Sequence, residues 1–190
     1  MKQIDSLGNV ISTHTPTVML CLFSYGGVKG QTVWSLIQEM RYFDRLGVNF
    51  VFHSIDDDAL ISRSRSKALS AFMANKKLDV CFMLDHDIEF EQGALLSTCV
   101  KAKMTQSCVS GFYSARAIGG GFSSRPKDEK GTIVAGSDVL VEAEYLAGGF
   151  LAIPRVVVEE VFANGERTRE LLKTTHTSNG DPSAKLANCA

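Results

Sequence analysis

The chain has 190 residues, 20 of them basic and 21 acidic, and its formal net charge at pH 7 is −1. This length predicts one domain with a sizeable core, and the near-zero charge excludes a global basic field for nucleic acid or an anionic membrane. Hydrophobic residues at 45% and charged residues at 22% are typical of a soluble globular protein. The sequence contains no stretch of eighteen apolar residues, so it predicts no membrane-spanning helix.

Strand-like and helical patterns alternate along the first half of the chain. Short apolar runs predict strands, and apolar residues at a 3.6-residue spacing predict helices. Gly47 is a plausible stop for the first helix. In chain order we expect a strand at Thr17–Ser24, a helix at Gln31–Leu46 (apolar at Val33, Leu36, Ile37, Met40 and Phe43), a strand at Asn49–Ile55, a helix at Ala59–Ala74, a strand at Asp79–Leu84, a helix at Gly93–Lys103 and a strand at Ser107–Tyr113.

The second half is less regular. Ser114–Ser137 is rich in Gly, Ser and Lys, which predicts a mobile loop. Val139–Tyr145 and Gly149–Ile153 are expected to be short strands, and Pro154 opens a helix that runs to about residue 162. The alternation of strands and helices predicts an α/β protein with a doubly wound sheet.

Five cysteines are spread along the chain and form no Cys-x-x-Cys pair. Three of them lie in apolar, strand-like runs, which favours reduced and buried thiols over disulfides. We therefore expect a cytoplasmic protein.

The third predicted strand ends in two carboxylates one residue apart, Asp85 and Asp87. In an extended chain, residues i and i+2 point to the same face, and open α/β sheets bind ligands at the carboxyl ends of their strands. Two carboxylates suit Mg²⁺ or Mn²⁺, which keep positions open for phosphate oxygens. The alternative is a strand-end Asp that caps the next segment. His86 is expected on the other face, in a structural role.

Four motifs in this order resemble those of the GT-A fold glycosyltransferases, in particular small bacterial and viral enzymes similar to family 2. They are Ile61-Ser62-Arg63-Ser64-Arg65-Ser66, Asp85-His86-Asp87-Ile88, Gly111-Phe112-Tyr113 and Tyr145-Leu146-Ala147-Gly148-Gly149-Phe150-Leu151. The resemblance covers roughly residues 17–162, and Ser66 departs from it because these proteins usually have Asn there.

The resemblance implies a Rossmann-like α/β/α sandwich with a mostly parallel central sheet, in one domain over residues 1–190. A truncated C-terminus and a minimal enzyme both stay open. It also implies metal-dependent transfer of a sugar from a UDP- or GDP-linked donor, with Mn²⁺ or Mg²⁺ as cofactor. The acceptor stays open between a glycan, a protein and a modified nucleobase.

The resemblance further implies roles for single residues. Asp87 would bind the metal directly, and Asp85 would reach the ribose or, through water, the metal. Ser24 and Tyr25 would hold the base and ribose, although an ordinary turn before the following glycines is the alternative. Arg65 would serve the diphosphate or the two carboxylates.

Asp56 ends the second strand and is a candidate acceptor of hydrogen bonds from the base or ribose. Its competing role is to cap the next helix together with Asp57 and Asp58, and we prefer capping for the three as a group. Arg63 and Lys67 share a helix face about 200° away from Arg65, so these cations cannot all serve one phosphate.

An inverting transferase needs a carboxylate that takes the acceptor's proton. Asp181, followed by Pro182, has the form that relatives show at this point and is the candidate base. It is also a plain helix N-cap with Pro at the first position, and we prefer the cap to the base. His176 is a candidate third metal ligand, against the simpler interpretation of a lone polar histidine. Glu142 and Glu144 share one strand face, and a solvated edge is their expected role.

Two other functions stay open. A non-catalytic or truncated GT-A domain would bind a nucleotide sugar without transferring it. A phosphohydrolase of the haloacid dehalogenase type also places Asp-x-Asp after a strand, but normally after the first strand, whereas here two complete strand–helix units precede the motif.

Overall fold

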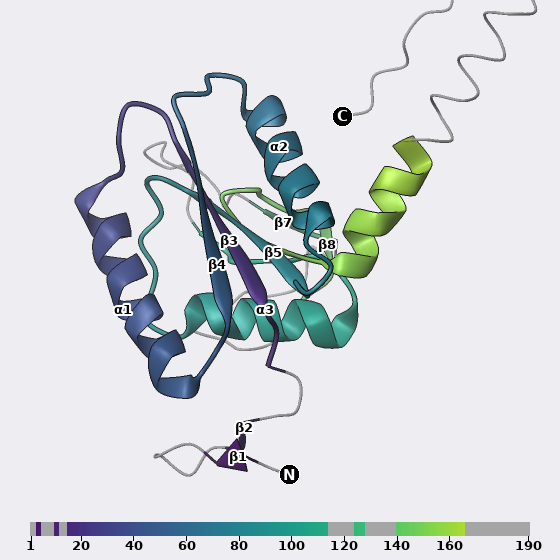
Figure 1. Cartoon of the computed structure of the whole chain (residues 1–190). Helices are drawn as coiled ribbons and strands as arrows, with labels where there is room; N and C mark the ends of the chain where they lie inside the picture. The colour runs from purple at the N-terminus through teal and green to yellow at the C-terminus, as the bar shows by residue number, and fades with distance from the viewer. Residues whose placement is uncertain (1–2, 5–9, 12–14, 114–123, 128–139, 166–190) are drawn as a thin grey trace, which may run out of the picture.

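A five-stranded sheet lies between two layers of helices in the computed structural model, which describes residues 3–4, 10–11, 15–113, 124–127 and 140–165 (Figure 1). β1 and β2 form a separate antiparallel pair. The elements are β1 (Gln3–Ile4), β2 (Val10–Ile11), β3 (Val18–Ser24), α1 (Gly30–Leu46), β4 (Phe50–Asp56), α2 (Ile61–Ala74), β5 (Val80–Asp85), α3 (Ala94–Thr105), β6 (Val109–Ser110), β7 (Arg125–Pro126), β8 (Ala143–Tyr145), β9 (Phe150–Pro154) and a helix over residues 155–165.

The central sheet has the strand order β4-β3-β5-β9-β6. β4, β3 and β5 are mutually parallel, and β9 runs antiparallel to both of its neighbours. The register pairs Ser24 with Asp56, and Phe23 with Asp85, so the carboxyl ends of the three parallel strands meet at one edge of the sheet. The prediction of an α/β fold with a mostly parallel sheet is confirmed.

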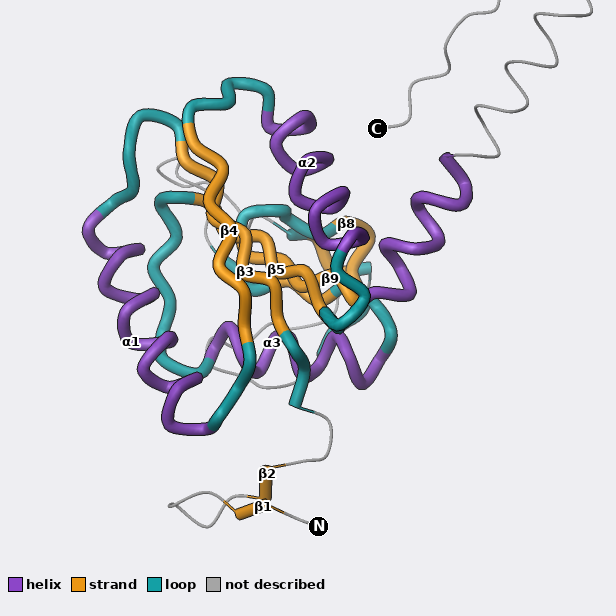
Figure 2. The backbone as a smooth tube through the Cα atoms, viewed as in Figure 1, coloured by secondary structure: helices purple, strands orange, loops and turns teal. Residues whose placement is uncertain are grey.

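Two hydrophobic cores fill the space on either side of the sheet. α1 and α3 cover one face with a core that includes Leu20 and Phe82, while α2 and the helix over 155–165 cover the other with a core that includes Cys21 and Phe72 (Figure 2). Successive residues of a strand point to opposite faces, and β3 and β5 are central strands. Their continuous apolar runs are therefore buried on both sides.

Two charged side chains act as helix caps from a distance. Glu39 of α1 is buried and accepts hydrogen bonds from the backbone N–H groups of Gly93 (2.6 Å) and Leu96 (2.9 Å) at the start of α3. Arg155 donates to the carbonyl groups of Phe72 and Asn75 at the end of α2, and its guanidinium lies 4.5 Å from the Phe72 ring centroid. These contacts satisfy backbone groups that a helix leaves unpaired at its ends.

Several predicted boundaries are confirmed, and others are wrong. α1 ends at Leu46, and Gly47 has the left-handed conformation (φ 63°) of a C-terminal stop. β6 has two residues where seven were expected. Arg125–Pro126 was placed in a loop but forms β7, which pairs with β8; most of the remainder of that segment lies outside the described residues.

The described cysteines Cys21, Cys81 and Cys99 are buried free thiols, and Cys108 is half-buried, as predicted. Burial raises the pKa of the Cys99 and Cys108 thiols. Among the described residues, every helix is too short or too polar to cross a membrane.

Candidate functional site

A pocket with a volume of about 690 Å³ opens at the carboxyl ends of the parallel strands. The residues that line it belong to the ends of β3, β4 and β5, the turn after β5, the segment before α2 and the start of α2, together with Tyr113. Open α/β sheets bind ligands at this edge, and the volume is in the range of small-molecule sites.

Asp85 and Asp87 both line this pocket, as predicted, but not for the predicted reason. β5 ends at Asp85, and the next two residues form a turn in which the Ile88 N–H approaches the Asp85 carbonyl at 3.4 Å. The alternation of an extended chain therefore does not continue to Asp87. His86 also lines the pocket, so its expected placement on the other face is wrong.

The turn that bears Asp87 is held by α1. The His86 carbonyl accepts hydrogen bonds from the Lys29 N–H and the Thr32 hydroxyl, both at 2.9 Å. Ser35 Oγ accepts from the Phe90 N–H at 3.0 Å. These contacts fix the backbone on both sides of Asp87.

Arg65 reaches the pocket through Asp85. Its Nη2 lies 3.3 Å from Asp85 Oδ1, and both side chains are about one-third exposed. Arg65 itself does not line the pocket, and its Nε is buried without a hydrogen-bond partner in the described part of the chain. Arg65 was expected to bind either the diphosphate or the two carboxylates, and in the structure it contacts the carboxylate of Asp85.

Gly148 and Gly149 leave the space that this arrangement needs. A Cβ atom at Gly148 would lie 2.3 Å from Arg65 Nη1, and one at Gly149 would lie 2.9 Å from Asp85 Oδ2 and 2.5 Å from the Tyr113 hydroxyl. The Gly149 N–H donates to that hydroxyl at 3.1 Å, and the Asp85 N–H donates to the Gly149 carbonyl at 2.9 Å. The two glycines therefore leave room for the side chains of Arg65, Asp85 and Tyr113.

Ser24 and Tyr25 line the pocket from the end of β3. Ser24 is buried, whereas Tyr25 is 64% exposed and its ring is open to solvent. Gly26 and Gly27 follow with φ values of 76° and 104°, conformations that favour glycine. The two residues named from the sequence therefore lie at the pocket, next to the expected turn.

The three acidic residues at the end of β4 and directly after it take three different positions. Asp56 is exposed, accepts a hydrogen bond from Ser54 Oγ at 2.8 Å and does not line the pocket. The Asp57 N–H donates to the Ser24 carbonyl at 2.9 Å. α2 begins only at Ile61, and its N-cap residue Leu60 makes no side-chain capping bond. Of the three acids, Asp58 alone binds the start of this helix, where it accepts from the Leu60 N–H.

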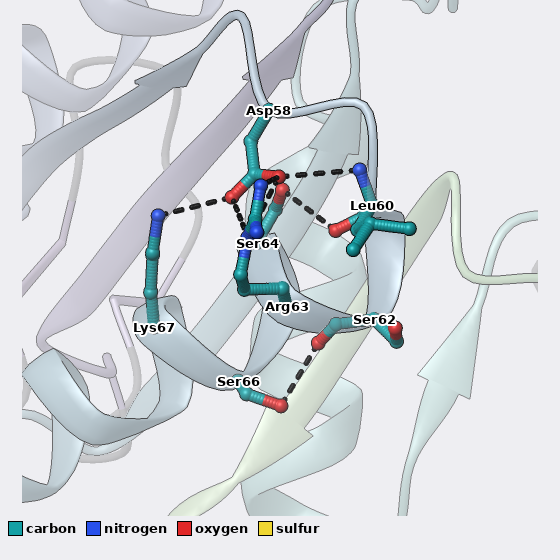
Figure 3. A network of polar contacts seen from close by, with 7 residues as sticks. All are labelled: Asp58, Leu60, Ser62, Arg63, Ser64, Ser66 and Lys67. Carbon is teal, nitrogen blue, oxygen red and sulfur yellow. Dashed lines mark hydrogen bonds and ion pairs between the residues drawn. The ribbon is translucent and has the colours of Figure 1, made fainter.

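Asp58 is the pocket residue that sequence reasoning assigned only to capping. Its carboxylate accepts from Arg63 Nη2 (2.6 Å), Lys67 Nζ (3.0 Å) and the Leu60 N–H (3.2 Å), as Figure 3 shows. The Arg63 hydrogen bonds, followed by that of Lys67, hold the pKa of Asp58 well below its usual range. Arg63 and Lys67 lie five and nine residues after Asp58. Their position so soon after the acid was the sequence signal that could have indicated these ion pairs.

Of the candidate metal ligands named from the sequence, Asp85 and Asp87 lie within the described residues and line the pocket. In the described ranges no group of three or more His, Cys, Asp or Glu side chains is arranged to hold a metal. A two-carboxylate site is compatible with Mg²⁺ or Mn²⁺, because these ions commonly take their remaining ligands from water and substrate phosphates.

Four further residues were considered from the sequence as metal ligand, catalytic base or acidic surface residues. His176 and Asp181 lie outside the described residues. Glu142 and Glu144 form exposed ion pairs with Lys127 (3.2 Å) and Arg125 (3.1 Å). The solvated edge expected for both glutamates is confirmed.

Comparison with known proteins gives one fold-level likeness. No protein-family model matches the chain, and no curated protein does. The chain is similar to a solved structure, A197 from STIV, with a TM-score of 0.52 and 21% identity over 75% of this chain and 67% of that one. At this identity the likeness shows a mixed α/β fold alone.

Proposed function

We propose that this protein is a metal-dependent glycosyltransferase of the GT-A type, with the donor diphosphate bound beside Asp85 and Asp87. The observation that carries the proposal is the meeting of both carboxylates with Ser24 and Tyr25 around one pocket of about 690 Å³. The sequence motifs supply the family resemblance, and the mostly parallel sheet is compatible with it.

The residues that line the pocket support a nucleotide-diphosphate ligand. The exposed ring of Tyr25 offers a stacking surface for a base. The carboxylates of Asp85 and Asp87 would hold a divalent cation, which when bound stabilises the negative charge that develops on a departing diphosphate. Arg65, 3.3 Å from Asp85, orients that carboxylate and adds a positive charge behind it.

The acceptor's proton needs a separate base. Asp181 is proposed for this role by resemblance. Neither Glu142 nor Glu144 competes strongly, because each is bound in an exposed ion pair away from the pocket lining.

Calorimetric titration of UDP and GDP, with and without Mn²⁺, tests the binding part of the proposal. We expect Mn²⁺-dependent binding that Asp87→Ala and Asp87→Asn each weaken at least about 100-fold, since the amide keeps the shape of the side chain but removes its charge. Glu91→Gln, at an exposed acid outside the pocket lining, is the matched control. Unchanged affinity in both Asp87 variants would remove the metal assignment.

Release of nucleotide diphosphate from UDP- and GDP-sugars tests the transferase part. Turnover that requires Mn²⁺ and disappears in Asp87→Asn supports an enzyme. Binding with no turnover of any donor would instead indicate a domain that holds a nucleotide sugar without transferring it.

A further inference from the structure

α1 presents an apolar side chain cluster to solvent. Val33, Trp34, Ile37 and Met40 are each between 37% and 60% exposed, while the polar Thr32, Ser35 and Glu39 of the same helix are buried. Three of the apolar residues whose spacing predicts this helix, Val33, Ile37 and Met40, therefore lie on its solvent side. Exposed apolar clusters of this kind mark interaction surfaces.

The neighbouring sheet edge is also open. β4 is the end strand of the sheet, and no described strand pairs with its outer side (Figure 1). Val51 and Phe52 in it are both 43% exposed. Natural edge strands are usually protected by Lys, Pro or bulges, but β4 (sequence FVFHSID) contains no Lys or Pro, and its pairing with β3 is regular over seven residues.

These two features adjoin on one side of the molecule. Phe43 of α1 packs edge-on against Phe50 of β4, with ring centroids 5.4 Å apart. Met40 lies one turn nearer the N-terminus of α1, and Phe52 lies two residues further along β4 on the same sheet face as Phe50. The exposed side of α1 and the open edge of β4 therefore form one continuous surface, here called the α1/β4 surface.

We propose that the α1/β4 surface binds a second copy of this chain, through antiparallel pairing of β4 with β4. The two-fold axis of such a pair is perpendicular to the sheet, so the two α1 helices come to lie antiparallel on the same face. One geometry would then pair the open backbone groups of β4 and cover the apolar side of α1. A typical stable interface buries about 800 Å² per partner, more than an edge strand alone supplies.

Charge complementarity favours a second copy over other partners. Lys29, Val33, Ile37, Met40 and Asp44 lie within about 80° of one another around α1. Antiparallel packing centred near Ile37 sets Val33 against Met40 of the copy and Lys29 against Asp44 of the copy. α1 has no acidic residue in its first turn, so the copy's Asp44 would also compensate the positive end of the helix.

The mass of the full chain in solution, measured by light scattering and sedimentation from about 1 to 100 μM, tests the proposal. We expect a species of twice the 20.7 kDa chain mass at the upper concentrations. Ile37→Lys should raise the dimer dissociation constant at least about 30-fold, as for a central interface residue. Val156→Lys, at a residue 43% exposed on the helix over 155–165, is the matched control and should have no effect.

A charge exchange distinguishes self-association from any other contact. Lys29→Asp and Asp44→Lys each place like charges together at two symmetric positions and should weaken the dimer about 3- to 30-fold. The double variant restores both attractions and should recover the dimer. Because both residues are exposed, circular dichroism should show unchanged folding in all three proteins.

Three outcomes would overturn the proposal. They are a monomer at every concentration, a dimer that Ile37→Lys and the single charge variants leave unchanged, and a double variant no better than the single ones. A monomer that sediments with vesicles of anionic phospholipid, with a blue shift of Trp34 emission, would assign the surface to lipid instead. Trp34 is the only tryptophan in the chain and is 60% exposed.

Discussion

Gly148→Ala tests whether the Arg65–Asp85 contact matters to the pocket, with little effect on the rest of the fold. The added Cβ would lie 2.3 Å from Arg65 Nη1, 2.6 Å from Cζ and 2.8 Å from Nη2. Ordinary carbon contacts begin near 3.5 Å, so the guanidinium must withdraw by about 1 Å. Its contact with Asp85 is already 3.3 Å, and such a withdrawal takes it beyond hydrogen-bond distance.

The expected magnitude is modest because the ion pair is partly solvated. Hydrogen bonds to charged groups contribute about 1.5–3 kcal/mol, and exposure lowers this toward about 1 kcal/mol for side chains that are one-third exposed. The affinity for UDP or GDP with Mn²⁺ should therefore fall about five- to tenfold. The melting temperature should fall by less than about 4 °C, since the displaced group is the flexible end of a side chain.

Calorimetry and thermal unfolding measure the two effects separately. Gly165→Ala is the control, because a Cβ there meets no atom within 4 Å. Gly148 does not have a positive φ, so the substitution adds no backbone strain. If Gly148→Ala binds nucleotide as tightly as the control, Arg65 does not support the pocket in the way described.

Three further predictions concern single carboxylates. Glu39→Ala should lower the free energy of unfolding by about 2–4 kcal/mol in urea titrations, because two buried N–H groups lose their acceptor. Burial raises the pKa of Glu39 above 4.5. The difference in free energy of unfolding between wild type and Glu39→Gln should therefore be largest below pH 4.5 and decline as the pH rises through the folded-state pKa. Asp58, whose pKa is lowered, shows the opposite sign: the advantage of wild type over Asp58→Asn should be full at neutral pH and narrow as the pH falls below 3.8. Asp181→Asn should leave nucleotide binding intact and lower transfer by orders of magnitude if Asp181 is the base, whereas near-normal transfer would identify it as a helix cap.

The elements best predicted from the sequence are those whose local pattern has one physical solution. β3 and β5 are continuous apolar runs, which a central strand with two buried faces requires. The end of α1 at Gly47 follows from a conformation that glycine adopts readily. The pairing of Asp85 and Asp87 in one pocket was also predictable, because the carboxyl end of a central strand leads to the ligand edge whatever turn follows.

The parts that could not be predicted depend on how the loops and turns after the strands fold. Asp58 looks like one of three equivalent acids at the end of β4, and only the fold of the loop shows which of the three binds Arg63 and Lys67. His86 reaches the pocket because a turn follows Asp85, and that turn is held by Thr32, 54 residues earlier in the chain. Local spacing contains no information on a partner as distant as Thr32.

α1 connects the pocket with the proposed dimer surface. Its buried side is partly polar because Thr32, Ser35 and Glu39 bind the turn and helix start that follow β5. A helix has only one side toward the core, so polar residues there displace apolar residues to the outside. Val33 and Ile37 cannot exchange places with the polar set without releasing the backbone around Asp87. The apolar cluster on α1 is thus exposed because the opposite side of the helix holds the pocket backbone in place. Pairing with a second copy would remove that cluster from water. It would not disturb the site, since antiparallel strands place the two pockets at opposite ends of the joined sheet.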